Sequence, residues 1–297
     1  MKANMKAKWL VELDLFTDTE DSLIQTIKDS GRIVKTLNRV TKDELSNVCR
    51  SYFDDDECVV FYGSLNFGKK IMKMPWVPGI YLDDDICKCT SYYPYFGDEL
   101  LHKDYTMLPF GDFRRLAPSL FERYGETLYI RPNTGFKSFS GTILNKDNFD
   151  YSLSIIDFYK IESNELIIVD KAIDIKKEWR FVIVDEKVIS GSLYRDWTIG
   201  PEELTENAIT SDLVLLNSKM VHELCTDEKA SEYAQKMAKR YNYSRAWTLD
   251  IALTKNDEYK TIEINSFSCS ALYKNDLNKV VEAVSIAAED EWKEYQI

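Results

Sequence analysis

The sequence predicts an α+β fold in which a small α/β domain precedes a larger domain built on antiparallel sheets. Strand-like and helix-like segments alternate over the first hundred residues, which is the rhythm of βαβ units. Beyond residue 126, strand-like segments dominate and helices are few. Two later stretches have the alternation of hairpins whose polar residues share one face. The predicted domains are residues 1–110 and 111–297.

The N-terminal domain is predicted from the spacing of its apolar residues and its turn residues. Strands are expected at residues 9–13, 32–37 and 58–62, with a short helix at 21–28 that ends before Gly31. Residues 80–97 are rich in Asp, Tyr and Cys, and we expect an irregular segment there. An amphipathic helix is expected at residues 110–124, where the boundary between the domains falls.

The larger domain is expected to consist mainly of strands. They are predicted at residues 127–131, 139–144, 165–171, 177–184 and 187–195, and in a hairpin over 247–265. Helices are expected near residues 147–159, 227–241 and 276–294. This arrangement predicts antiparallel rather than parallel sheets for the larger domain.

Composition excludes several classes of function. The 297 residues are 44% hydrophobic, which suffices for a globular core, and the net charge of -12 argues against a broad duplex-binding surface. Six scattered cysteines and two histidines leave few parts for zinc sites or histidine-dependent triads. The sequence has no apolar run of membrane-spanning length and no signal-peptide core at its start, so we expect a cytoplasmic protein without a membrane segment.

The hairpin at residues 247–265 carries the most informative pattern. A turn centred on residues 256–257 would place Asp250 opposite Glu263 and Thr248 opposite Asn265. Two carboxylates opposed at about 5 Å repel each other unless a cation compensates them. Carboxylate and amide oxygens suit Mg²⁺. The hairpin therefore predicts a magnesium site at Asp250, Glu263 and Asn265, and the alternative is an amphipathic hairpin with a solvated acidic face.

A second pattern lies where the strand ending at Arg131 runs into a loop bracketed by Gly135 and Gly141. Glycines allow backbone N–H groups to approach a phosphate, and Arg131 and Lys137 would neutralise its charge. The spacing matches neither a Walker A loop nor a dinucleotide-binding loop. In isolation, the same pattern also describes an ordinary hairpin turn.

The third pattern is a hairpin over residues 178–195. Glu178 and Arg180 share a strand face, and Arg195 joins them if Asp185-Glu186 is a two-residue loop. The alternative is a ladder of ion pairs on an exposed sheet. The preceding apolar strand ends at Lys171 and Ala172, where an adenine ring could pack with its edge bound by the backbone.

In this order the motifs resemble those of the ATP-grasp superfamily, above all in Asp250 followed by Glu263-Ile264-Asn265. More narrowly, the stretches at 131–141, 178–180 and 263–268 resemble an ATP-grasp branch found largely in bacteriophages and named for two arginines and a lysine. The resemblance covers residues 127–273 well and residues 58–110 loosely. Better-known ATP-grasp ligases offer a lysine to the phosphates where this chain has Arg131, whose fork would bind phosphate with different geometry.

The resemblance implies a site for ATP and Mg²⁺ between two α+β lobes with antiparallel sheets, behind a small α/β domain. It implies that Arg131, Lys137 and Ser138 bind the phosphates, that Lys171, Ala172 and Glu178 contact the rest of the nucleotide, and that Asp250, Glu263 and Asn265 hold the metal. Glu178 would orient Arg180 or the ribose rather than act as a base.

The implied activity is that of a carboxylate-amine ligase. A small-molecule or peptide carboxylate would attack the γ-phosphate, and an amine or similar nucleophile would capture the acyl phosphate, with release of ADP and phosphate. Arg180, Arg195 and Lys137 would stabilise the reacting groups. The acid, the acceptor and the oligomeric state are not specified, and the protein would work in the host cytoplasm if a phage encodes it.

Two other functions are compatible with the sequence. A non-catalytic nucleotide-binding module acting on a partner protein would fit the acidic composition and the 18 tyrosines. A ligase acting on RNA or tRNA, which is not favoured, would use a basic patch at Lys69, Lys70, Lys73, Arg114 and Arg115. The aromatic run at residues 92–97 would either line an acceptor pocket or pack between the domains.

Overall fold

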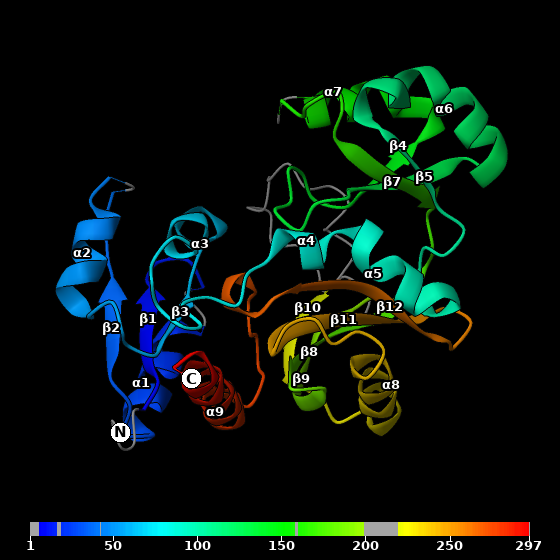
Figure 1. Ribbon diagram of the computed structural model, residues 1–297. Helices are drawn as coiled ribbons and strands as arrows, with labels where there is room; N and C mark the ends of the chain where they lie inside the picture. The colour runs from blue at the N-terminus through cyan, green and yellow to red at the C-terminus, as the bar shows by residue number, and fades with distance from the viewer. Residues whose placement is uncertain (1–5, 17–18, 42, 158–159, 199–218, 297) are drawn as a thin grey trace, which may run out of the picture.

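Three sheets organise the protein, for which a computed structural model describes residues 6–16, 19–41, 43–157, 160–198 and 219–296. A three-stranded parallel sheet lies at one end, and a four-stranded and a five-stranded sheet make up the rest. Figure 1 shows the four-stranded sheet above the five-stranded one, with α4 and α5 between them. The predicted α+β fold is confirmed.

The N-terminal sheet has the predicted βαβ character. Its strands β1 (Lys8–Glu12), β2 (Val34–Leu37) and β3 (Val59–Tyr62) pair in parallel in the order β2-β1-β3. Helix α1 (Glu20–Asp29) connects the first two strands, and α2 (Leu45–Tyr52) and α3 (Leu65–Ile71) follow β2 and β3. The predicted strands and the first helix are thus present, and α2 and α3 are additions to the predicted elements.

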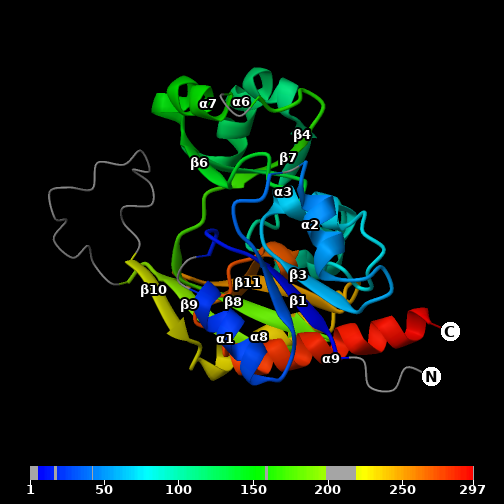
Figure 2. The same ribbon diagram turned by 90° about the vertical axis from the view of Figure 1, so that its left-hand side faces the viewer.

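The last helix, α9 (Leu277–Tyr295), returns to this N-terminal sheet. Its buried residues Val280, Val281 and Val284 share one hydrophobic cluster with Trp9 and Val11 of β1. Figure 2 shows α9 running beside α1 and β1. The helix was predicted, but the partner it packs against was not. Among the described residues, no helix combines the length and apolar character that crossing a membrane requires.

The prediction of an irregular segment at residues 80–97 was wrong. The chain forms α4 (Asp84–Cys87), α5 (Cys89–Phe96) and the 3-10 turn η1 (Gly97–Glu99) there. Asp83 caps α4 by accepting hydrogen bonds from the backbone N–H groups of Asp85 and Ile86. Helix α5 contains Pro94, and burial of Tyr92, Tyr93 and Phe96 in the core outweighs its poor helix propensity.

The four-stranded sheet carries two of the phosphate-binding candidates. Its antiparallel order is β4-β7-β5-β6, made from β4 (Thr106–Pro109), β5 (Thr127–Pro132), β6 (Thr142–Asn145) and β7 (Leu166–Lys171). Helices α6 (Phe110–Tyr124) and α7 (Phe149–Asp157), the latter preceded by the turn η2 (Lys146–Asn148), share a core with one face of the sheet. Strand β4 was not predicted, and β6 begins three residues later than predicted. The boundary between the two domains at residue 110 stays a prediction. Strand β4 lies just before this boundary and pairs with β7, a strand beyond it.

The five-stranded antiparallel sheet has the order β10-β9-β8-β11-β12. Its strands are β8 (Ile175–Val184), β9 (Lys187–Asp196), β10 (Lys219–Leu224), β11 (Ala246–Thr254) and β12 (Tyr259–Ser266), and the turn η4 (Phe267–Cys269) follows. Helix α8 (Glu228–Ala238) packs on the face that carries Trp179, Phe181 and Ile183. Glu178 and Arg180 therefore lie on the opposite face.

The predicted pairs of the hairpin over residues 247–265 are confirmed, and the hairpin over 178–195 has the two-residue loop on which its grouping depended, with two bulges along its strands. Asp250 pairs with Glu263 and Thr248 with Asn265, although a bulge follows Asp250. The loop between β8 and β9 is the two-residue Asp185-Glu186, and both residues have positive φ, 44° and 64°. Arg195 lies opposite Glu178, so the conditional grouping on one face also holds.

The contact between β1 and α9 gives a test of whether the two ends of the chain stabilise each other. The Trp9 Nε1–H donates to Ser285 Oγ at 3.0 Å, and both side chains are fully buried. Ser285→Ala should lower the free energy of unfolding by about 1–3 kcal/mol, because the indole N–H loses its acceptor. Urea denaturation measures this, with the exposed Ser22→Ala as control, expected within about 0.5 kcal/mol of wild type. Equal stability of the two variants would contradict the argument.

Candidate functional site

Charged side chains from both antiparallel sheets meet where β5 and its following loop approach β12. Strand β5 supplies Arg131 and the loop after it supplies Lys137, and the five-stranded sheet supplies Arg180, Asp250, Glu263 and Asn265. The predicted residues Arg131, Lys137, Arg180, Asp250, Glu263 and Asn265 thus form one connected set of contacts.

Glu263 is the centre of this set. Its carboxylate pairs with Arg131 Nη2 at 2.9 Å and Lys137 Nζ at 3.2 Å, and it accepts a hydrogen bond from Asn265 Nδ2 at 3.0 Å. Burial alone would raise the pKa of Glu263, but Lys137, Arg131 and the Asn265 hydrogen bond hold that pKa well below its ordinary value of 4.5. The carboxylate is therefore fully ionised at neutral pH.

Asp250 and Arg180 form a forked pair beside it. Arg180 Nε donates to Asp250 Oδ1 at 2.8 Å and Nη2 to Oδ2 at 2.7 Å, while Nη1 donates to the Ala271 carbonyl at 3.2 Å. Burial opposes the charge of Arg180, but the Asp250 carboxylate raises the pKa of the guanidinium above its ordinary value. The rings of Tyr194 and Tyr273 lie 5.7 and 5.2 Å from its Cζ. These contacts fix the orientation of Asp250.

The donor atoms of Asp250, Glu263 and Asn265 fit a hard cation. Asn265 points its Nδ2 at Glu263 and, at 3.5 Å, at Asp250, so its amide must turn for the oxygen to reach a cation held between the two carboxylates. Two carboxylates and one amide oxygen suit Mg²⁺, which commonly completes its shell with water and phosphate oxygens. Within the described ranges, no three His, Cys, Asp or Glu side chains lie close enough together to hold a metal ion. A metal site here would therefore use the Asn265 amide oxygen as its third protein ligand.

The loop after β5 is fastened to α4. Thr134 Oγ1 and the Phe136 N–H both donate to Asp84 Oδ1, at 2.5 and 3.2 Å. A Cβ on Gly135 would lie 2.5 Å from the Cys87 Cβ, and one on Gly141 would lie 2.4 Å from the Tyr129 hydroxyl. Both glycines are thus required by contacts inside the protein, a reason that the sequence did not reveal.

The remaining loop candidates differ in their surroundings. Ser138 donates its hydroxyl hydrogen to Glu165, and its described contacts do not include the Glu263 cluster. Lys171 is exposed and Ala172 half-buried at the end of β7. Their predicted roles at the nucleotide stay predictions.

Glu178 and Arg195 belong to a second group of contacts. Glu178 accepts hydrogen bonds from Tyr194 Oη at 2.7 Å and Trp197 Nε1 at 3.1 Å, and Arg195 Nη1 lies 3.9 Å from it. A bulge in β9 between Leu193 and Arg195 accounts for two consecutive residues reaching Glu178. The described contacts of Glu178 do not include Arg180, so the expected orientation of Arg180 by Glu178 gives way to orientation by Asp250.

Another feature near the end of β7 was missed from the sequence. His102 stacks on Tyr129 at 3.9 Å with an interplanar angle of 3°, and its Nδ1 lies 3.8 Å from Asp170 Oδ2. Burial, then the nearby Arg131, lowers the pKa of His102 to about 3. The imidazole is neutral at pH 7. No local pattern could reveal this, because the ring comes from the connection before β4 while its partners lie on β5 and β7.

The basic residues considered for RNA do not form one patch. Lys69 and Lys70 lie on α3 and Arg114 and Arg115 on α6, which Figure 1 shows far apart. Lys69 lies over the Phe136 ring, and Lys70, Arg114 and Arg115 pair with acids. In the aromatic run, Tyr92, Tyr93 and Phe96 are buried, as expected for packing, whereas the ring of Tyr95 is exposed.

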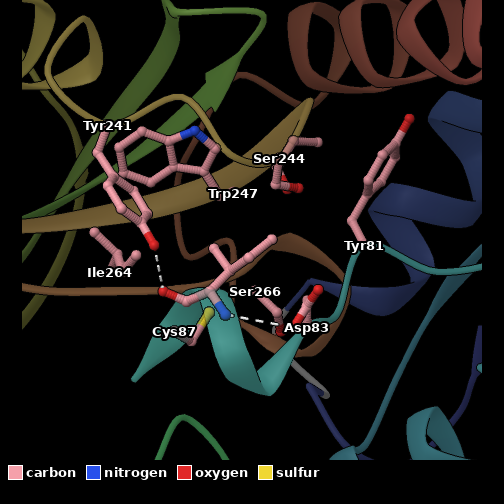
Figure 3. Close-up of a pocket in the computed structure, with 10 residues that line it drawn as sticks. Tyr81, Asp83, Cys87, Tyr241, Ser244, Trp247, Ile264 and Ser266 are labelled. Carbon is pink, nitrogen blue, oxygen red and sulfur yellow. Dashed lines mark hydrogen bonds between the residues drawn. The ribbon is translucent and has the colours of Figure 1, made fainter. Parts of the chain in front are cut away.

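A small pocket, whose lining residues are drawn in Figure 3, adjoins β12. Ile264 and Ser266 line it, and they alternate with Glu263 and Asn265 along the strand. Tyr241 Oη donates to the Ile86 carbonyl across its wall, at 2.8 Å. Burial and the acids Asp83, Asp84 and Glu263 raise the pKa of the Cys87 thiol to about 12, so this thiol stays protonated. The pocket is separate from the charged cluster.

Two antiparallel sheets joined across Glu263, behind a parallel α/β domain, define an ATP-grasp fold, and solved structures agree. D-cycloserine synthetase DcsG gives a TM-score of 0.60 at 11% identity, covering 96% of this chain and 99% of its own. D-alanine–D-alanine ligase from Bacillus anthracis complexed with ATP gives 0.60 at 15%, covering 99% and 100%. ATP-grasp ligase PsnB complexed with minimal precursor gives 0.56 at 10%, covering 96% and 100%.

A comparison with family models assigns the chain to one family within the ATP-grasp fold. The model of the ATP-grasp domain, R2K clade family 2, matches residues 111–283, more than half of the chain, and the protein belongs to this family. The predicted ATP-grasp relationship is therefore confirmed. A search of curated proteins found no match.

The neutral, buried His102 predicts a dependence of stability on pH. Its pKa of about 3 lies below the ordinary 6.5, so between these values the unfolded chain binds a proton that the folded chain does not. Stability must fall as pH decreases through this window, by at most about 1.4 kcal/mol per pH unit from this residue. His102→Gln should flatten the curve of unfolding free energy against pH from pH 7 to 4.

Urea titrations at several pH values measure the effect. Lys103→Gln, at an exposed neighbour, is the control, because a lysine stays protonated throughout this range. Parallel curves for wild type and His102→Gln would show that the argument is wrong.

Proposed function

We propose that this protein is an ATP-dependent ligase that joins a carboxylate to an amine or similar nucleophile through an acyl phosphate, with release of ADP and phosphate. The observation that carries the proposal is the meeting of Arg131 and Lys137 with the metal-binding candidates Asp250, Glu263 and Asn265 between two antiparallel sheets. Membership of the ATP-grasp family supports ATP as the nucleotide.

The charge of the cluster favours an anion. Arg131, Lys137 and Arg180 carry three positive charges and Asp250 and Glu263 two negative ones, so the formal sum is +1. A triphosphate would share Arg131 and Lys137 with Glu263 and would add negative charge where the protein has an excess of cations. The cluster therefore suits a nucleotide phosphate chain better than an isolated divalent cation.

Each residue then has a distinct part. Arg131 and Lys137 bind phosphate oxygens, and Asp250, Glu263 and Asn265 hold Mg²⁺. When bound, Mg²⁺ draws charge from the phosphate oxygens as a Lewis acid. Arg180 keeps Asp250 in place through its forked contact. Arg195 is half-buried and its Nε has no hydrogen-bond partner among the described residues, so it is the cation that can turn toward the transferring phosphoryl group.

The proposed reaction has two steps, phosphoryl transfer to the carboxylate and acyl transfer to the nucleophile. A carboxylate oxygen forms a bond to the γ-phosphorus while the bond to the β–γ bridging oxygen breaks, and ADP leaves. The nucleophile then attacks the acyl carbon, loses its proton, and expels phosphate. Both steps move negative charge among oxygens that cations can stabilise, which is the main protein contribution in phosphoryl transfer. The solved structures with this fold include D-alanine–D-alanine ligase and an ATP-grasp ligase complexed with its minimal precursor, which supports a ligase that acts on a carboxylate.

Product analysis tests the proposal directly. With Mg²⁺, ATP and mixtures of candidate acids and amines, we expect ADP and phosphate in equal amounts, detected by chromatography and a phosphate assay. AMP and pyrophosphate as the obligate products would contradict the acyl-phosphate route. Tight binding of Mg²⁺ and ATP by calorimetry, without turnover in any mixture, would instead indicate a nucleotide-binding module.

Glu263→Gln tests the metal assignment. Loss of a direct ligand should lower Mg²⁺-dependent ATP turnover by about 100-fold or more, since even the outer partners of metal ligands are worth about 10–100-fold. Without Mg²⁺, the same variant should bind ATP several-fold more tightly, roughly the effect of one unopposed charge, because Arg131 and Lys137 lose their competing carboxylate. Glu282→Gln removes an exposed acid on α9 as the charge control. Unchanged turnover in Glu263→Gln would reject the assignment.

A further inference from the structure

Arg131 is held at both ends of its guanidinium fork by residues from different parts of the fold. Nη2 contacts Glu263 on β12 at 2.9 Å, and Nη1 donates to the Tyr92 hydroxyl on α5 at 3.2 Å. Arg131 is 3% exposed and Tyr92 is fully buried. Tyr92 lies in the segment that the sequence predicted as irregular, and no motif connects it with phosphate binding.

We infer that Tyr92 is a positioning residue that aims Arg131 at the nucleotide phosphates. The inference rests on the proposed function, because it assumes that Arg131 binds phosphate. Arginine has a planar guanidinium, whereas lysine carries a compact point charge. The guanidinium binds phosphate with both of its N–H groups only when its plane has the correct orientation. A hydroxyl that holds one end of the fork sets that plane.

The hydroxyl is itself held in place. The Tyr92 ring packs edge-on against Phe96 and Tyr241, with centroids 5.9 and 6.3 Å apart. Its oxygen accepts from Arg131, and Cys89 Sγ lies 3.7 Å away as a partner for its own proton. Burial raises the pKa of Tyr92 well above its ordinary value, so the phenol is neutral. It orients the guanidinium without neutralising it.

Tyr92 differs in this respect from Glu263, the other described partner of Arg131. Glu263 is a metal-binding candidate and carries a charge that phosphates and metal would compete for. A neutral hydroxyl has no such competition, so it can keep its bond to Nη1 while Nη2 turns from Glu263 to a phosphate oxygen. The two contacts therefore serve different states of the same arginine.

Calorimetry of ATP and of adenosine separates positioning from packing. Tyr92→Phe keeps the ring and removes the acceptor, and we expect the Kd for ATP to rise about 10-fold, the effect of a lost hydrogen bond to a charged group. Adenosine has no phosphate, so its Kd should stay within about twofold. Tyr233→Phe is the control, because this half-buried tyrosine on α8 donates its hydroxyl to the Glu99 carbonyl and has no described contact with Arg131, so the variant should bind ATP like wild type.

Several outcomes would overturn the inference. One is wild-type ATP affinity in Tyr92→Phe, and another is equal weakening for ATP and adenosine, which would indicate packing alone. In an Arg131→Gln background, Tyr92→Phe should have no further effect on ATP affinity, and an undiminished effect would also contradict it. Failure of the wild-type protein to bind ATP would instead contradict the proposed function.

A second variant keeps the test decisive if Tyr92→Phe does not fold. A fluorinated tyrosine placed at position 92 keeps the ring and the hydroxyl but makes the oxygen a poorer acceptor. It should weaken ATP binding in the same direction, by less than Tyr92→Phe, and leave adenosine binding unchanged. Wild-type ATP affinity in this variant would overturn the inference.

Discussion

The pairing of Glu263 with cations from the opposite sheet is the interaction on which the site depends. A buried carboxylate is costly unless opposite charges and hydrogen bonds compensate it. Glu263 lies on the five-stranded sheet, whereas Arg131 belongs to the four-stranded sheet and Lys137 to the loop that follows β5. Electrostatic compensation of a single side chain therefore links the two sheets, beside the apolar cluster that joins Ile168 of β7 to Trp179 of β8.

The rest of the molecule supports this junction. The hairpin of β11 and β12 presents Asp250 and Glu263 together, and Arg180 on β8 partly offsets the repulsion between their charges by pairing with Asp250. Helix α4 holds the loop of Lys137 through Asp84. These contacts orient the charged side chains of the site before a ligand binds.

Much of the fold could be predicted from the sequence because it follows from local patterns. Strand alternation, a property of neighbouring residues, placed the polar residues of each hairpin on one face, whereas the pairings of Asp250 and Arg195 also depend on bulges that the alternation does not reveal. The order of the charged motifs likewise sufficed to identify the family. The failures lie where long-range packing decides: helix α5 forms despite Pro94, because its aromatic side chains are buried against the five-stranded sheet.

The sequence by itself determined most of the strands, though not β4 and β10, and the polar face of each hairpin. It also gave the candidate residues Arg131, Lys137, Arg180, Asp250, Glu263 and Asn265. Tertiary structure alone decided their partners: Arg180 for Asp250, Arg131 and Lys137 for Glu263, and Tyr92 for Arg131. The physical reason is distance along the chain. Alternation fixes which way a side chain points from its own strand, but the approach of another sheet or helix fixes what it meets, and that depends on how the entire core packs.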